Sequence, residues 1–202
     1  MKWTTEQLNE MRVGRPTYGE EKKSGALTWV RTAEETGGEY SLLYVEVGPG
    51  YRVFPHYHTQ YTETFTILEG FGPGRFGKQT IHVKAGDEVV VPPGMIHGWG
   101  PIGDVHVKAV TELRPGHPGF EKWLVMLHGM AADGLTKPDL QPYSFVHGAL
   151  FLTESDSYLI GPARALNPVF KVVAWFARKA GVDRRLEEKY YRPITGEVAA
   201  SG

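Results

Sequence analysis

The sequence predicts an all-β core followed by a helical C-terminal extension. Residues 26–114 contain a series of short runs rich in β-branched and aromatic residues, and Gly, Pro or Asp closes each run. The runs are ALTWV, YSLLYVEV, YRVF, ETFTILE, QTIHV, DEVVV and VHVKAVTEL. Many short strands at this spacing predict a sandwich or a barrel. Beyond Arg114-Pro115-Gly116 the segments become longer, and their apolar residues recur at helical spacing.

The two segments that flank the predicted core differ in size and character. Residues 1–25 form a short lead-in, where Thr4 and Gln7 can form a capping box at the start of one or two helical turns. Residues 115–202 form the helical extension. Its first apolar residues recur every three or four positions, as on one face of a helix, namely Phe120, Trp123, Leu124 and Leu127.

The last part of the extension predicts two further helices. Residues 169–180 have an amphipathic pattern that Gly181 ends, and Asp183 is expected to cap a second helix that runs through Tyr190. We expect the apolar side chains of 169–180 to pack against the outside of the barrel or across a dimer interface. A membrane-surface role is less favoured, because interfacial helices usually carry a larger basic face.

Composition and charge exclude several classes of protein. A length of 202 residues suits one domain, or one compact domain with a substantial extension. With 41% hydrophobic and 22% charged residues, the chain can bury the core of an ordinary globular protein. The 22 basic and 23 acidic side chains give a net charge of -1, so no excess positive charge is present to hold a phosphate backbone. We therefore expect no nucleic-acid partner.

The absence of cysteine restricts any metal site to nitrogen and oxygen ligands. The polar N-terminus, MKWTTEQLNE, has no apolar segment followed by a small-residue cleavage site, so the expected location is cytoplasmic. The longest apolar-rich stretch, 169–177, is interrupted by Lys171 and is far shorter than the roughly 20 residues of a spanning helix. We accordingly expect no membrane partner.

A group of His and Glu residues has the spacing of metal ligands. His56 and His58 are two residues apart, so in an extended strand both imidazoles project from one face. Four residues separate His58 from Glu63, a length suited to a hairpin that returns a carboxylate beside the histidines. His97 follows the turn residues PPGMI and is expected at the start of a strand. Such spacing predicts a metal site with His56, His58, Glu63 and His97 as ligands.

These residues also fill a known pattern, and the sequence resembles the cupin superfamily. The first cupin motif is Gly, five residues, His-x-His, three or four residues, Glu, six residues, Gly. It is filled here by Gly50, His56, His58, Glu63 and Gly70. The second motif is Gly, five residues, Pro-x-Gly, two residues, His, three residues, Asn. Its matching positions are Gly86, Pro92, Gly94 and His97, whereas Pro101 replaces the Asn, which is not a ligand.

The resemblance implies a six-to-eight-stranded jelly-roll β-barrel with the metal in its interior. The helical extension is similar to the tail of some bacterial single-domain cupins of unassigned activity. From strand alternation, the side chains expected to point inward beside the metal are Phe54, Phe65, Ile67 and Trp99. Tyr57, Gln60 and Tyr61 are close to the ligands in sequence, but the sequence does not orient their side chains.

Three histidines and one carboxylate around an ion that prefers six ligands would leave two positions open, which favours chemistry over a structural role. The leading hypothesis is a metal-dependent dioxygenase that acts on a small organic molecule, with Glu63 able to accept a substrate proton. One alternative is a non-redox isomerase or decarboxylase in which the metal polarises a carbonyl group. Another is a barrel that binds a small ligand without catalysis.

The expected cofactor is one divalent transition metal, with Fe preferred and Mn, Ni, Cu or Zn possible. The expected partners are a small-molecule substrate and a second copy of the chain, because two-fold homodimers are the commonest oligomers. The pattern G-x-G-x-x-G at residues 72–77 lies between strands instead of opening a helix, so we expect no dinucleotide cofactor.

Overall fold

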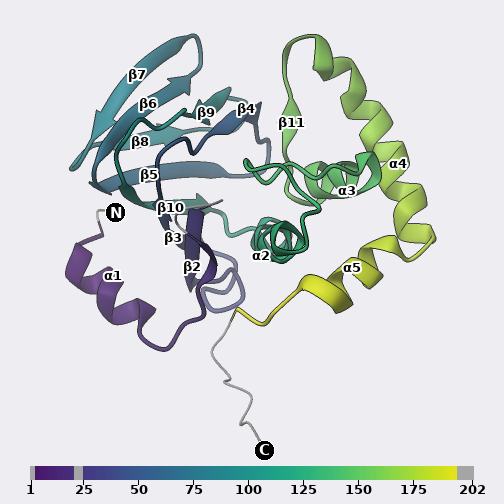
Figure 1. Cartoon of the computed structure of the whole chain (residues 1–202), viewed down its shortest axis with the longest axis horizontal. Coiled ribbons are helices and arrows are strands. Elements are labelled where there is room, and N and C mark those ends of the chain that lie inside the picture. Colours follow the sequence, from purple (N-terminus) through teal and green to yellow (C-terminus); the bar gives the residue numbers. More distant parts are fainter. Residues whose placement is uncertain (1–2, 21–24, 195–202) are drawn as a thin grey trace, which may run out of the picture.

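The computed structural model describes residues 3–20 and 25–194, which form two antiparallel sheets and five α-helices (Figure 1). The larger sheet has six strands in the order β1-β2-β3-β10-β5-β8. These strands are β1 (Tyr18–Glu20), β2 (Gly25–Arg31), β3 (Ser41–Val47), β5 (Thr62–Glu69), β8 (Glu88–Val91) and β10 (Val107–Arg114). The predicted all-β core is confirmed.

The smaller sheet has five strands in the order β11-β4-β9-β6-β7. They are β4 (Val53–Tyr57), β6 (Phe71–Phe76), β7 (Gln79–Lys84), β9 (His97–Trp99) and β11 (Tyr158–Leu159). From β3 to β10 the chain crosses from one sheet to the other at every connection except that between β6 and β7. This repeated crossing winds the strands into a jelly roll, as the sequence predicts.

Alternation along the strands explains how the barrel fills and how its outer face is covered. On β10, Ala109 belongs to an apolar cluster inside the barrel, whose buried members are Val47, Ile67, Val83, Ile102, Val107 and Ala109. The adjacent Val110 points to the opposite face and belongs to a cluster that contains Leu8 of helix α1 (Thr5–Arg12). The capping box predicted for Thr4 and Gln7 is present at the start of α1.

The helical extension lies against one end of the barrel (Figure 1). It comprises α2 (Pro118–Ala132), α3 (Phe145–Glu154), a 3-10 helix (Gly161–Leu166), α4 (Asn167–Lys179) and α5 (Val182–Tyr190). These helices share an apolar cluster that includes Trp123, Leu127, Leu150 and Phe170. Within the described parts of the chain, none of the helices is long and apolar enough to span a membrane.

The junction between α4 and α5 confirms one sequence prediction and corrects another. Gly181 has φ 68, the left-handed conformation that follows a helix end, so α4 ends where the sequence indicates. Gly181 itself, however, occupies the N-cap position of α5, and Asp183 lies inside its first turn. The expectation that Asp183 caps this helix is wrong, because the single glycine turn joins the two helices without a spacer.

Both segments outside 26–114 contribute strands to the barrel. β1, in the lead-in, pairs with β2, and β11, in the extension, pairs with β4. In the second pairing Leu159 lies opposite His56, so the extension reaches the strand that carries candidate metal ligands. Both strands are too short to show alternation in the sequence.

Candidate metal centre

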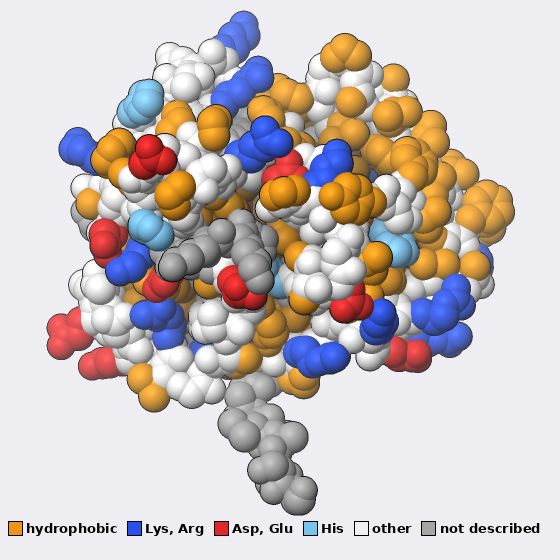
Figure 2. Space-filling model, in the orientation of Figure 1, with side chains coloured by type: hydrophobic (Ala, Val, Ile, Leu, Met, Phe, Trp, Pro, Cys, Tyr) orange, Lys and Arg blue, Asp and Glu red, His pale blue; other side chains and the backbone are white. Residues whose placement is uncertain are grey.

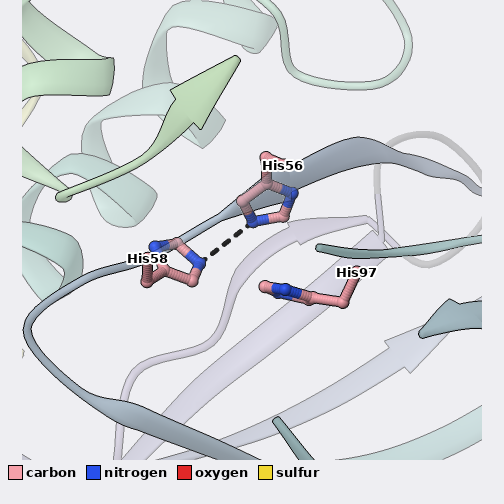
Figure 3. Close-up of side chains that lie close together, drawn as sticks. All are labelled: His56, His58 and His97. Carbon is pink, nitrogen blue, oxygen red and sulfur yellow. Dashed lines mark hydrogen bonds between the residues drawn. The ribbon is translucent and has the colours of Figure 1, made fainter. Parts of the chain in front are cut away.

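Three buried histidines converge inside the barrel (Figure 3). His56 lies on β4, His58 follows directly after that strand, and His97 begins β9. Antiparallel pairing places His56 opposite His97. Ring centroids are separated by 4.7 Å between His56 and His58, 4.4 Å between His56 and His97, and 5.2 Å between His58 and His97.

Backbone carbonyls determine which nitrogen of each ring carries the proton. The Nδ1 atoms of His56, His58 and His97 lie 2.8, 3.0 and 3.2 Å from the carbonyl oxygens of Phe54, Asp156 and Met95, respectively. A carbonyl only accepts, so each Nδ1 must carry the hydrogen and donate it. In the neutral rings each Nε2 then has a free lone pair, which is the form that binds a metal ion.

The three lone pairs point toward a common region. The Nε2 atoms of His56 and His58 are only 3.0 Å apart, the contact drawn as a dashed line in Figure 3. With both Nδ1 atoms protonated, this contact brings two lone pairs together instead of forming a hydrogen bond. A cation between the rings would turn this repulsion into two attractive contacts. One ligand atom from each of the three histidines lies within 4.8 Å of the others.

Glu63 completes the group from the opposite sheet. It lies on β5, and its Oε2 atom is 2.8 Å from His97 Nε2 and 3.7 Å from His58 Nε2. Glu63 Oε2 and His97 Nε2 are close but not aligned for a hydrogen bond, and both buried atoms lack a hydrogen-bond partner among the described residues. Buried polar atoms without partners are rare and costly, so both indicate a missing ligand.

The path from His58 to Glu63 differs from the prediction. The hairpin expected between them is wrong, because β4 and β5 belong to different sheets and do not pair. The intervening residues instead carry the chain across the end of the barrel. Glu63 therefore faces the histidines across the interior, and the carboxylate approaches them from another wall.

Burial and mutual repulsion keep two of the histidines neutral. Burial is the main reason why the pKa of His56 lies well below its usual value, and the nearby His58 and His97 lower this pKa further. Burial and His97 lower the pKa of His58 to about 3. Burial also opposes a charge on His97, but the Glu63 carboxylate raises the pKa of that ring. Three imidazole nitrogens and one carboxylate oxygen in this state fit a divalent transition metal.

The helical extension holds His58 in place. Besides the carbonyl of Asp156, the Nδ1 of His58 contacts the Tyr61 hydroxyl at 2.6 Å, and that hydroxyl donates to the carbonyl of Ser155 at 3.1 Å. The Asp156 carboxylate accepts hydrogen bonds from the backbone N–H groups of Thr59 and Gln60 and from the Thr59 hydroxyl. The turn before β11 thus fixes the segment that carries a candidate ligand.

Sequence reasoning missed Asp156 because almost a hundred residues separate it from His58. A signal is visible only in the backbone: Asp156 has φ 53, a conformation that is uncommon outside glycine and often marks functional sites. The neighbouring Tyr57 has a different role, because its ring stacks on Tyr158 of β11 with 5.1 Å between centroids.

A cavity of 180 Å³ adjoins the cluster, and His56, Glu63 and His97 form part of its wall. The four side chains expected to point inward line it: Phe54, Phe65, Ile67 and Trp99. Helix α2 supplies Phe120, Leu124, Leu127 and His128 to the same wall. The extension therefore forms part of the cavity wall as well as supporting a ligand.

Few polar groups other than the cluster face the cavity. Tyr51 lines it, and burial together with the Glu63 charge raises the pKa of this phenol to about 12, so the hydroxyl stays protonated at neutral pH. Asp139 and Gln141 also line it, and Asp139 pairs at 3.6 Å with the exposed Arg52. The site therefore offers the Tyr51 hydroxyl as a proton donor close to Glu63, on a surface that is otherwise largely apolar.

Comparison with known families agrees with the fold and the motifs. Residues 43–111 match the model of the family described as "Cupin domain". This part of the chain is a cupin domain. The matched part of this cupin begins in β3 and ends in β10, and it contains His56, His58, Glu63 and His97.

Individual relatives match this cupin over part of its length. An 87-residue stretch is 32% identical to the quercetin 2,3-dioxygenase of Bacillus subtilis, covering 43% of this chain and 26% of that protein. A cupin-2 domain from Rhodospirillum rubrum aligns with a TM-score of 0.44 and 19% identity over 56% of this chain and 72% of that one. A predicted oxalate decarboxylase from Thermotoga maritima aligns with a TM-score of 0.44 and 18% identity over 50% and 91%. The chain spans about a quarter of the curated dioxygenase.

Proposed function

We propose that this cupin is a metal-dependent enzyme that acts on a small organic molecule, with one divalent metal held by His56, His58, Glu63 and His97. One observation carries the proposal. Three histidine Nε2 lone pairs and a carboxylate oxygen without a hydrogen-bond partner converge at the wall of a cavity. A purely structural site would not need a cavity beside its ligands.

The reaction class that we propose is dioxygenation. When bound, an iron(II) ion would supply the redox chemistry and, with four protein ligands, would leave positions for substrate and dioxygen. The partial identity with quercetin 2,3-dioxygenase supports this class without specifying the substrate.

The chain's own residues would bind the substrate and move its proton. Once it is released from the metal, Glu63 can accept a proton from a bound hydroxyl or carbon acid, a role that an imidazole coordinated to a metal cannot fill. Tyr51 stays protonated at neutral pH, so it can donate a hydrogen bond to a substrate oxygen. Phe54, Phe65 and Trp99 exclude water from the same space.

The cavity limits the size of the substrate. Its 180 Å³ is close to the roughly 150 Å³ of an engineered apolar cavity that binds benzene. A compact, mostly apolar molecule built on about one ring fits this volume, with its oxygen atoms directed toward the cluster and Tyr51.

A second candidate, a non-redox isomerase or decarboxylase, is favoured by the presence of both Glu63 and Tyr51 on the cavity wall. One group can accept a proton and the other can donate one, which is the requirement for moving a hydrogen within a substrate. In that case a redox-inert metal would only need to polarise a carbonyl group.

Metal analysis of natively purified protein tests the site first. His58→Ala is expected to lose most of the metal, whereas His82→Ala, which removes an exposed histidine on β7, should retain it. Equal metal in all three proteins would refute the assignment of the ligands.

Oxygen uptake then tests the reaction. After anaerobic loading with iron(II), single-ring phenols and dicarbonyl compounds should stimulate oxygen consumption in the native protein and not in His58→Ala. Turnover with zinc under nitrogen would instead identify the non-redox class. A compound that binds tightly and is recovered unchanged under both conditions would favour a binding protein.

A further inference from the structure

Helix α4 packs with one face and leaves the opposite face exposed. Phe170, Ala174 and Ala177 are buried against the other helices of the extension. On the outward face Val172 is 56%, Trp175 51% and Phe176 62% exposed. The buried face of α4 therefore packs on other helices of the extension and not on the outside of the barrel, as one of the two expectations had it, and the outward face stays exposed.

The exposed apolar residues form one surface. Figure 2 shows hydrophobic side chains gathered over α3 and α4, on the right of the view. The Phe145 ring, exposed at the start of α3, contacts Phe170 of α4 with 4.9 Å between centroids. We call this surface the α4 patch; its exposed large apolar members are Tyr143, Phe145, Leu166, Val169, Val172, Trp175 and Phe176. Apolar groups gathered in this way usually mark an interaction surface.

The segment that contains α4 has more basic than acidic side chains. Residues 161–185 contain Arg164, Lys171, Arg178, Lys179, Arg184 and Arg185 but one acidic residue, Asp183, although the whole chain has a net charge of -1. Of these cations, only Arg178 and Arg184 form ion pairs with carboxylates among the described residues. The other four, Arg164, Lys171, Lys179 and Arg185, form no ion pair with a carboxylate among the described residues.

Two of these cations lie at the margin of the apolar surface. The ammonium group of Lys171 lies 5.3 Å from the ring centroid of Tyr158, and that of Lys179 lies 5.8 Å from the ring centroid of Trp175. Long basic side chains in this position can rest their methylene groups on an apolar surface while the ammonium group reaches polar headgroups. Trp175 has the amphipathic ring that is enriched at membrane interfaces.

In contrast to the sequence-based expectation of no membrane partner, we infer that the α4 patch binds the surface of a bilayer that contains anionic lipids, with α4 lying in the plane of the interface. Such a bilayer surface is complementary to both features of the patch, because the apolar side chains can insert among the acyl chains and the anionic headgroups attract the cations. If two copies of the chain associated through this patch, the basic rim of one copy, formed by Lys171 and Lys179, would face that of the other, and the repulsion opposes dimer formation. The inference is independent of the metal centre.

Vesicle co-sedimentation with the full-length protein tests the inference. Vesicles of neutral phosphatidylcholine are compared with vesicles that contain about one third phosphatidylglycerol. We expect binding to the anionic vesicles, weakened on the order of tenfold or more by Trp175→Ser combined with Phe176→Ser. The matched control is Phe71→Ser combined with Val90→Ser, which removes side chains that are 56% and 54% exposed on the barrel and should leave binding unchanged.

A second pair of variants tests the contribution of the basic side chains to vesicle binding. Lys171→Gln with Lys179→Gln should weaken binding several-fold, whereas Lys78→Gln with Lys84→Gln, on the far side of the barrel, should not. Added salt should weaken binding of the native protein. Circular dichroism confirms that each variant is folded.

Three results would overturn the inference. One is the absence of binding to anionic vesicles. Another is equal binding to neutral and anionic vesicles, which would refute the role of the basic rim. The third is a concentration-dependent dimer, detected by light scattering, that Trp175→Ser with Phe176→Ser dissociates while vesicle binding of the native protein is absent. This result would assign the α4 patch to a second copy of the chain.

Discussion

Replacing Asp156 with asparagine tests whether the helical extension positions a metal ligand. The carboxylate accepts hydrogen bonds from the backbone N–H groups of Thr59 and Gln60 and from the Thr59 hydroxyl, and its carbonyl accepts from His58. Burial opposes its charge, but the bonds from Thr59 and Gln60 hold the pKa of Asp156 below its usual value. Asparagine tolerates the φ of 53 and keeps one side-chain oxygen, so the substitution removes mainly the charge and one acceptor.

The size of the effect follows from these contacts. A hydrogen bond to a charged group contributes about 1.5–3 kcal/mol, so we expect the free energy of unfolding to fall by roughly 2 kcal/mol. For a chain of this length, that corresponds to a decrease in Tm of roughly 4–8 °C. Because loss of a group that orients a ligand commonly weakens metal binding, we expect zinc affinity to fall about 10–100-fold.

The assay is competition for zinc against a chromophoric chelator, at a temperature where both proteins are folded. Asp104→Asn, which alters an exposed aspartate between β9 and β10, is the control and should change neither quantity. A lower Tm with unchanged zinc affinity would refute the reasoning. Asp156 would then stabilise the fold without positioning His58.

Three further predictions concern the cavity and the helical core. Burial lowers the pKa of His128 from 6.5 to about 4, so the unfolded chain takes up a proton first as the pH falls. The neutral His128 side chain should contribute fully to the free energy of unfolding above pH 6.5. As the pH falls toward 4, the free energy of unfolding should decrease by as much as about 3 kcal/mol. In metal-free protein, His128→Leu should flatten this part of the pH profile of urea unfolding, and a parallel profile would contradict the assignment. Ala109→Leu should fill part of the cavity and lower turnover of any substrate while metal content stays unchanged; loss of metal as well would show a wider disturbance. Leu150→Ala should cost about 2–5 kcal/mol in thermal unfolding and preserve a single transition, whereas two separate transitions would show that the extension unfolds independently.

The features that sequence predicted well depend on residues close together in the chain. The spacing of His56 and His58 places both rings on one side of β4, and the turn before His97 delivers it at the start of β9. Gly181 ends α4 because a left-handed turn needs a residue without a Cβ atom. In each case the geometry follows from a few neighbouring residues.

The features that sequence did not predict depend on distant partners. The connection from His58 to Glu63 has the length of a hairpin, and only the pairing of β5 with β8 and β10 shows that it crosses between sheets. Asp156 has no local signal, because its role depends on an arrangement of helices that brings it to residues 58–60. Likewise, the outward face of α4 differs from its buried face only through the packing of α3 and α5.

The two-residue strand β11 has a consequence for how this protein evolves. Because β11 borders β4, and Asp156 lies two residues before it, recombination at residue 114 would separate a barrel from the residues that complete its sheet and hold one of its histidines. The barrel and the extension are therefore expected to be inherited together, with substitutions at residues 56–60 and 155–159 accepted in pairs. Exchange of the extension between relatives should fail unless these two segments are exchanged together.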